Sequence, residues 1–388
     1  MKFTFLKYFF KYIFFSKTRQ KLIFLAICGL LISSFSLVVI QGIMGGLQKG
    51  LVSRSKNVLG TGFIQTKNLS ITSEEYKSLI TTLVKNNITS IPELEIELLV
   101  QNEKFVSPVI LHGLDMSYSK PKFLKSRDFD ELILGSDLGR DLRAFFGSKI
   151  IVTSPSHTDF IFNEIPRQSI TEVSDFFSSE LPEIDKLHGW IRLSFMQNLI
   201  RKHEINKIRI YDKDIEYVSN ILSSSKLDYR VVSWEEQNSS LVWALNLETR
   251  VMLFLFIGMS FLIAICITSG FLIFFNKIKI DLSSFWILGM SKDQLSRLSY
   301  IFGQSITIIF SLLGLCLGLL FLYLLDSKLL VIMPDLFIER NIPVSLTISQ
   351  IIISFFVPYV ISSIFTHFTF KSFINESKSF LSLIRKVG

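Results

Sequence analysis

The chain alternates between long apolar stretches and one long polar stretch. Uncharged apolar runs cover residues 22–48, 251–276 and 300–325, and a fourth apolar run covers residues 341–370. Each run is long enough to cross a bilayer, because a spanning helix needs about 20 apolar residues. We therefore predict a membrane protein with four transmembrane helices, at residues 22–48, 250–276, 300–325 and 346–370.

The first apolar run is expected to stay in the membrane. It is longer than the apolar core of a cleaved signal peptide, and no A-x-A-like site follows it. Near its end, Gly42 and Gly46 are four residues apart, a spacing that either permits close helix packing or ends the helix. Gly314 and Gly318 in the third run have the same spacing, which favours a tight contact between helices.

Residues 49–249 predict a large mixed α+β domain, inserted between the first and second helices. Short β-type runs alternate with short helical runs along this span. Leu138, Leu142 and Phe145 recur at i, i+4 and i+7, which predicts the buried face of a short helix.

A protruding hairpin is predicted at residues 154–169, because two prolines and several turn residues occur there. Its tip carries Phe160, Ile161 and Phe162. These apolar side chains either form an exposed tip that contacts a partner or fold back onto the domain.

The charge distribution predicts the orientation. Most of the 33 acidic residues lie within residues 74–248, and basic residues flank the apolar runs. Because cytoplasmic loops carry an excess of Lys and Arg, both termini and the loop at 277–299 are expected in the cytoplasm, with the polar domain outside. The placement of basic residues in cytoplasmic segments explains the net charge of +8 better than nucleic-acid binding does.

The remaining predicted segments are an amphipathic N-terminus at 1–21, a short external loop at 326–345 and a cytoplasmic tail at 371–388.

No catalytic motif occurs in the sequence. The P-loop, H-E-x-x-H and G-x-S-x-G patterns are all absent, so we expect no catalytic residue and no ATP bound by this chain. The 3 cysteines lie in apolar runs and the 5 histidines lack ligand spacing, so no metal site is expected. No charge interrupts the middle of an apolar run, which argues against an ion-coupled transporter.

The loop at residues 277–299 carries apolar side chains where water is expected, namely Phe285, Trp286, Leu288 and Met290. Gly289 is expected to break a short helix, and Ser291 to cap the next one. The apolar side chains either dock on a partner or on the membrane surface, or pack beneath the helices.

Four stretches of the sequence resemble one family in their order and spacing. They are LILGSDLGRDLRAFFGSKIIVTS, SWEEQNSSLVWALNLETRVM, KIDLSSFWILGMSKDQLSRLSYIFG and ERNIPVSLT. They resemble the permease subunits of bacterial lipoprotein-releasing (Lol) ABC transporters, in a wider family that includes macrolide-exporter and cell-division permeases. The chain departs from the family in its ending, which lacks the usual Pro-Ala pair, and in having no charged residue just before Ile287.

The resemblance implies an ATP-driven complex. Two permeases, identical or paralogous, would assemble with two ATPase subunits, which bind ATP and Mg²⁺. It implies ATPase coupling residues in the cytoplasmic loop, at Phe285, Trp286, Leu288, Gly289, Met290, Ser291 and Gln294. It implies a lipoprotein cavity near Ile43, Met44, Leu47, Met252 and Phe256. It also implies a hook for a periplasmic lipoprotein carrier at Phe160, Ile161, Phe162, Pro166 and Arg167.

The expected function is extraction of lipoproteins from the inner membrane and their release towards the outer membrane. The alternatives within the family are a mechanotransmitter of ATPase motion and an efflux permease, each acting with a periplasmic partner. The long external domain favours lipoprotein release. A membrane-anchored receptor is a further alternative, but it would need neither four helices nor an apolar cytoplasmic loop.

Overall fold

The computed structural model describes residues 21–66, 71, 73–117, 119–124, 131–159, 165–211, 213, 215–223, 229–278, 284–285, 287–327 and 343–376. Residues 1–20 of the N-terminal segment predicted at 1–21 lie outside them, as does the hairpin tip at 160–164. The chain divides into two compact units. We call Met1–Lys49 with Leu245–Gly388 the membrane unit, and Gly50–Ala244 the polar domain.

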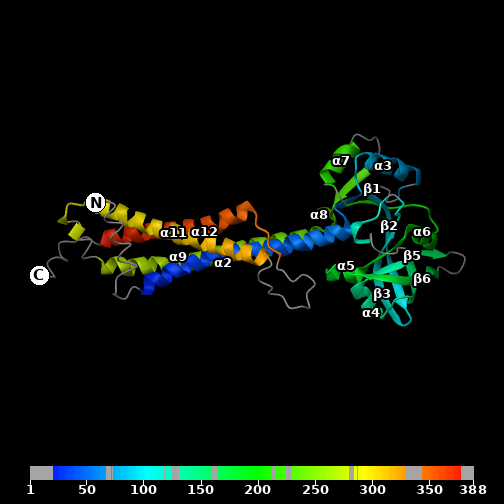
Figure 1. Ribbon diagram of the computed structural model, residues 1–388, viewed down its shortest axis with the longest axis horizontal. Coiled ribbons are helices and arrows are strands. Elements are labelled where there is room, and N and C mark those ends of the chain that lie inside the picture. The colour runs from blue at the N-terminus through cyan, green and yellow to red at the C-terminus, as the bar shows by residue number, and fades with distance from the viewer. Residues whose placement is uncertain are drawn as a thin grey trace. The chain divides into compact units, whose positions relative to one another are not determined.

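Four long helices, labelled in Figure 1, are long and apolar enough to cross a membrane, as predicted. They are α2 (Lys21–Leu59), α9 (Ser239–Lys277), α11 (Lys292–Asp326) and α12 (Ile348–Glu376). Helix α2 continues well past the apolar run that ends at residue 48. Its last turns stay helical because Val52, Val58 and Leu59 pack into the core of the polar domain.

Glycines bring helices of the membrane unit into close contact. Gly42 and Gly46 lie inside α2, so they do not end the helix. A Cβ at Gly46 would lie 1.9 Å from the Pro343 carbonyl oxygen. On α11, a Cβ at Gly314 would lie 2.3 Å from the Leu31 carbonyl oxygen, and one at Gly318 would lie 2.2 Å from Val38. The spacing of Gly314 and Gly318 therefore serves close packing of α11 against α2, whereas Gly46 lies against the segment that precedes α12.

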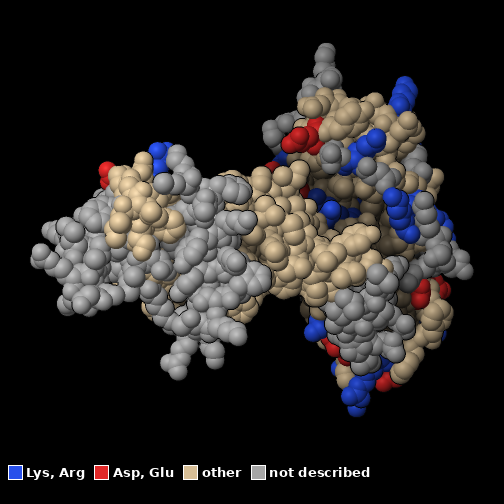
Figure 2. Space-filling view, turned by 60° about the vertical axis from the view of Figure 1, so that its left-hand side comes forward, with Lys and Arg blue, Asp and Glu red and all other residues tan. Residues whose placement is uncertain are grey.

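The polar domain contains nine described strands: β1 (Gly62–Thr66), β2 (Ser90–Asn102), β3 (Phe105–Leu114), β4 (Leu132–Gly135), β5 (Lys149–Asp159), β6 (Ile165–Phe177), β7 (His188–Arg192), β8 (Lys207–Ile210) and β9 (Tyr229–Ser233). Its helices are α3 (Ser73–Lys85), α4 (Ser136–Asp141), α5 (Pro182–Leu187), α6 (Leu193–Ile200), α7 (Ile215–Ser223) and α8 (Trp234–Gln237), with a short 3₁₀ turn at Lys122–Leu124. The predicted mixture of helices and strands is confirmed, and Figure 2 shows acidic and basic side chains spread over the surface of this domain.

The nine described strands form one continuous sheet, and β2 joins its two parts. With β8, β1 and β9 it forms an antiparallel four-stranded sheet in the order β2-β8-β1-β9, and α3 and α7 connect its strands. This order is that of a split βαβ fold. The strands β2-β3-β7-β4-β6-β5 form a second part, which closes because β2 pairs with both β3 and β5. We call this closed part the ring.

Two predictions about the polar domain have different outcomes. Leu138 and Leu142 are fully buried, but the prediction for Phe145 was wrong, since this side chain is 75% exposed. Helix α4 ends at Asp141, and a positive φ of 50° at Arg143 turns the backbone before Phe145. The predicted hairpin is confirmed, because β5 and β6 pair antiparallel on either side of its tip.

Candidate functional site

Helices α2, α9 and α12 enclose a cavity of about 90 Å³ in the membrane unit. Its lining consists of Ile40, Gln41, Met44, Gly45, Gln48, Glu248, Thr249, Met252, Leu253, Phe256, Gln350 and Ile353. Of the five residues assigned to a lipoprotein cavity by resemblance, Met44, Met252 and Phe256 line this space. Ile43 instead packs against the core cluster containing Val38 and Leu322, and Leu47 is 43% exposed.

The cavity has a mixed lining, in which Gln41, Gln48, Glu248, Thr249 and Gln350 are polar and the other side chains are apolar. Gln48 donates a hydrogen bond of 3.1 Å from Nε2 to Oε2 of Glu248. Met252 and Phe256 follow Glu248 at successive helical turns of α9, so they lie progressively farther from this polar pair. Such a lining can hold an amphiphile, with its polar group at the Gln48–Glu248 pair and its hydrocarbon against the Met and Phe side chains.

The loop at residues 277–299 separates into a buried and an exposed part. Met290 is only 5% exposed and joins a core cluster of the membrane unit, against which Phe285 also packs. Ile287 and Leu288 are 64% and 67% exposed. The apolar loop residues are therefore divided between the two predicted alternatives. Some pack beneath the helices, and others form an exposed apolar surface. Trp286 lies outside the described residues.

The turn that presents this apolar surface has the geometry that the sequence predicts. Gly289 adopts a φ of 102°, which glycine tolerates best. Ser291 caps α11, and its side chain accepts a hydrogen bond from the Gln294 amide while the Gln294 side chain accepts one from the Ser291 amide. This capping box fixes where the helix begins.

Of the five residues assigned to the carrier hook, the structure describes Pro166 and Arg167. Pro166 is exposed and lies opposite Thr158 where the β5–β6 register shifts. Arg167 donates a hydrogen bond from Nη1 to the carbonyl oxygen of Ile200, the last residue of α6. Phe160, Ile161 and Phe162 lie outside the described residues.

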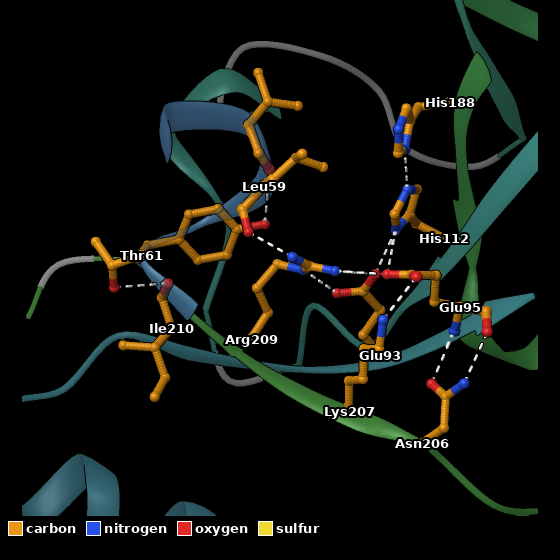
Figure 3. A network of polar contacts seen from close by, with 12 residues as sticks. Leu59, Thr61, Glu93, Glu95, His112, His188, Asn206, Lys207, Arg209 and Ile210 are labelled. Carbon is orange, nitrogen blue, oxygen red and sulfur yellow. Dashed lines mark hydrogen bonds and ion pairs between the residues drawn. The ribbon is translucent and has the colours of Figure 1, made fainter. Parts of the chain in front are cut away.

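The polar domain also contains a buried ionic network that the sequence did not indicate (Figure 3). Its centre is Arg209 on β8, which donates to both carboxylate oxygens of Glu93 and, at 2.7 Å, to Oε2 of Glu95. Lys207 donates to the second oxygen of Glu95 at 2.6 Å. Arg209 also donates from Nη1 to the carbonyl oxygen of Leu59, which ends α2.

Two histidines extend this network into the ring. Nδ1 of His112 on β3 hydrogen-bonds to Glu93, and its Nε2 lies 2.7 Å from Nδ1 of His188 on β7. These strands pair in parallel, with His112 opposite Trp190, and the three rings stack. The network therefore joins the end of α2, the four-stranded sheet and the ring.

Burial and neighbouring charges shift the pKa values in the network. Burial alone would raise the pKa of Glu93, but the charges of Arg209 and His112 outweigh it and hold this pKa far below its usual range. Burial, aided by the charges of His112 and Arg209, lowers the pKa of His188 to about 2. At neutral pH, Glu93 is therefore ionised and His188 is neutral.

Glu93, Glu95 and His112 are residue types that bind metals, and their ligand atoms lie within 4.8 Å of one another. In this arrangement, however, the charges of the two carboxylates are matched by those of Arg209 and Lys207. A divalent cation would have to displace the guanidinium from Glu93, so we assign the cluster to ion pairing. No sequence signal could reveal it, since Glu93 and Arg209 are 116 positions apart.

Known proteins resemble this chain along most of its length. It is 26% identical over 348 residues to the lipoprotein-releasing system transmembrane protein LolC of Buchnera aphidicola subsp. Acyrthosiphon pisum, covering 82% of this chain and 83% of that protein. Identity to LolC of Buchnera aphidicola subsp. Schizaphis graminum is 24%, with 86% of both chains covered. Identity to LolC of Xylella fastidiosa strain Temecula1 is 22%, with 78% and 77% covered. The resemblance to Lol permeases is therefore confirmed.

Two other comparisons add no further relationship. No family model matches the chain. The crystal structure of the extracellular domain of the noncanonic ABC-type transporter YknZ from Gram-positive bacteria aligns with 44% of this chain and 99% of that one, at 8% identity and a TM-score of 0.29. A TM-score this low does not establish a shared fold.

Proposed function

We propose that this chain is the permease subunit of an ABC transporter that extracts lipoproteins from the inner membrane and releases them towards the outer membrane. The observation that carries the proposal is the similarity to LolC proteins, which spans about four fifths of both chains. That length includes the membrane helices as well as the polar domain. A receptor sharing only an external domain would not produce it.

In this proposal, the cavity between α2, α9 and α12 receives part of the lipid anchor. Acyl carbons would contact Met44, Met252 and Phe256, and the polar group at the lipidated terminus would lie near Gln48 and Glu248. Withdrawing an acyl chain from a bilayer costs about 0.8 kcal/mol for each CH₂ group. An apolar binding site lowers this cost, but the full transfer requires an external energy source.

That energy would come from a partner ATPase that binds ATP and Mg²⁺, whereas this chain would bind no cofactor. We infer that the exposed side chains of Ile287 and Leu288 enter a groove of that ATPase, with Gly289 and the capped start of α11 holding their orientation. A second permease, either another copy or a paralogue, would complete the complex. A periplasmic lipoprotein carrier would receive the cargo at the β5–β6 hairpin.

The location follows from this function. The protein would be a multi-pass protein of the bacterial inner membrane, with both termini and the 277–299 loop in the cytoplasm. The polar domain would then lie in the periplasm, where a carrier could reach it. The excess of basic residues at the termini supports this orientation.

The proposal is tested by purifying the tagged chain with its associated proteins and reconstituting the complex in liposomes with a fluorescent lipoprotein. We expect a small P-loop ATPase to copurify and the lipoprotein to leave the liposomes only with ATP. Met252→Trp should fill the cavity and lower release about tenfold, because one misfit apolar group costs 1–3 kcal/mol.

The matched control is Leu262→Trp, which adds the same side chain to a position of α9 that is 64% exposed. It should leave release unchanged. A wild-type complex that hydrolyses ATP but releases no lipoprotein would contradict the proposal and favour an efflux permease or a mechanotransmitter.

A further inference from the structure

The end of α2 is fixed inside the polar domain by a buried cation. The last carbonyl groups of an α-helix have no partners within the helix. Here the Leu59 carbonyl accepts a hydrogen bond from the Arg209 guanidinium, and the Val58 carbonyl accepts one of 3.4 Å from the Tyr211 hydroxyl. A positive charge at this position also interacts favourably with the C-terminal end of the helix dipole.

The backbone immediately after α2 permits a change of direction. Gly60 has a φ of 74°, and a Cβ at this position would lie 2.4 Å from the carbonyl oxygen of Ile210. The strand β1 starts at Gly62, so only Gly60 and Thr61 separate the helix from the sheet. Backbone hydrogen bonds of Thr61 with Ile210 and Trp234 hold it to the sheet, so the change of direction lies at Gly60.

Side chains from the final turns of α2 add further contacts to the domain. Ser55 accepts a hydrogen bond of 2.9 Å from the indole of Trp234, and Lys56 forms an ion pair of 2.6 Å with Glu235. Arg54 forms an ion pair of 2.8 Å with Glu180. These partners lie in α8 or just before α5, whereas Arg209 connects α2 to the strands themselves.

Arg209 is the group through which three parts of the domain meet (Figure 3). It lies on β8 of the four-stranded sheet and contacts Leu59 of α2. Through Glu93 it also reaches β2, the strand shared by the sheet and the ring, and then His112 on β3. The planar guanidinium can serve all these acceptors at once because it presents five donors in a fixed geometry.

We propose that Arg209 is a positioning residue that fastens the end of α2 to the sheet and to the ring, so that a displacement of α2 moves the polar domain as one body. The inference rests on the proposed function, since it concerns how ATP-driven motion of the membrane helices performs work on the cargo. Without Arg209, α2 would turn about Gly60, and ATP hydrolysis would move the helix without moving the whole domain with it.

The test measures lipoprotein released per ATP hydrolysed by the reconstituted complex. In Arg209→Lys the positive charge remains, but one ammonium cannot serve Leu59, Glu93 and Glu95 together. We expect release per ATP to fall roughly tenfold, consistent with loss of a buried charge-assisted contact. Tyr211→Phe, which removes the contact to Val58 and no charge, should lower the ratio in the same direction by a smaller factor.

A matched control separates positioning from general stability. Val152→Ala removes buried apolar contacts in the ring, in a core cluster that does not include α2. It should lower the melting temperature and leave release per ATP unchanged. Amide hydrogen exchange at residues 58–64 should accelerate in Arg209→Lys and stay at the wild-type rate in Val152→Ala.

The outcomes distinguish this inference from the proposed function. If the wild-type complex releases no lipoprotein, the proposed function fails. If the wild type is active and both Arg209→Lys and Tyr211→Phe keep its release per ATP, the positioning role of Arg209 is refuted. The same holds if Val152→Ala lowers that ratio as much as Arg209→Lys does.

Discussion

Two nearby apolar residues of the 277–299 loop have opposite environments. Leu288 is 67% exposed and Met290 is 5% exposed, although both look equally suited to a docking surface in the sequence. The backbone reverses at Gly289, whose φ of 102° separates them. The apolar composition of the loop was therefore informative, but only the fold assigns Leu288 to a free surface and Met290 to the helix core.

Substitution by Asp should separate these roles. Leu288→Asp should leave the chain folded and lower complex-stimulated ATP hydrolysis about tenfold, because it places a charge in an apolar contact. Met290→Asp should instead reduce the amount of folded chain, since burying an unpaired charge costs several kcal/mol. The yield of folded chain in detergent and the ATPase rate of the complex check both predictions. Normal hydrolysis and normal yield in both variants would show that this loop contacts no ATPase.

At the scale of elements, α2 and α11 can approach each other closely because glycine has no side chain. The Gly314 Cα approaches the backbone of α2 so closely that a Cβ would lie 2.3 Å from the carbonyl oxygen of Leu31. Beside it, Ser34 donates a hydrogen bond of 2.8 Å to the carbonyl oxygen of Ser311. Small residues and hydroxyl groups hold helices together in membranes, where apolar burial between helices gains little.

Gly314→Ala should therefore destabilise the membrane unit by about 1–3 kcal/mol, because α11 must move away from α2. Gly258→Ala on α9 is the control, since no atom lies within 4 Å of the added Cβ. It should be neutral or slightly stabilising, as alanine favours helix. Fluorescence melting of the purified chain in detergent measures both, and equal shifts would contradict the close contact.

At the scale of the whole molecule, the buried network makes stability depend on pH. His188 has its pKa lowered to about 2 in the folded state, from an ordinary value of 6.5. Below pH 6.5 the unfolded chain takes up a proton that the folded chain does not, so stability decreases as the pH falls. Glu93 stays ionised in both states above its ordinary pKa of 4.5, so it adds no pH dependence between pH 5 and 7.5.

We expect the polar domain to lose about 2 kcal/mol of stability between pH 6.5 and 5, at roughly 1.4 kcal/mol for each pH unit. Melting followed by tryptophan fluorescence suits this measurement, because Trp190 and Trp234 are buried in the domain. His188→Asn keeps a donor towards His112 and should flatten the pH dependence. His203→Asn, at an exposed position, should preserve it. An unchanged slope in His188→Asn would contradict a buried neutral His188.

Sequence alone determined the four membrane helices, the mixed α+β character of the polar domain, the β5–β6 hairpin and the cap at Ser291. Each of these depends on residues near one another in the chain, where apolar periodicity and turn chemistry act directly. The family resemblance likewise followed from local motifs in a fixed order.

Only the tertiary structure decided which residues meet. Glu93 is brought to Arg209 by the pairing of β2 with β8, and His112 to His188 by the pairing of β3 with β7. Strand pairing brings together residues distant in sequence, and a change of register by one residue would turn these side chains to the opposite face. For the same reason, the sequence could not place the cavity: Met252 and Met44 share it only because α2 and α9 pack with these faces together.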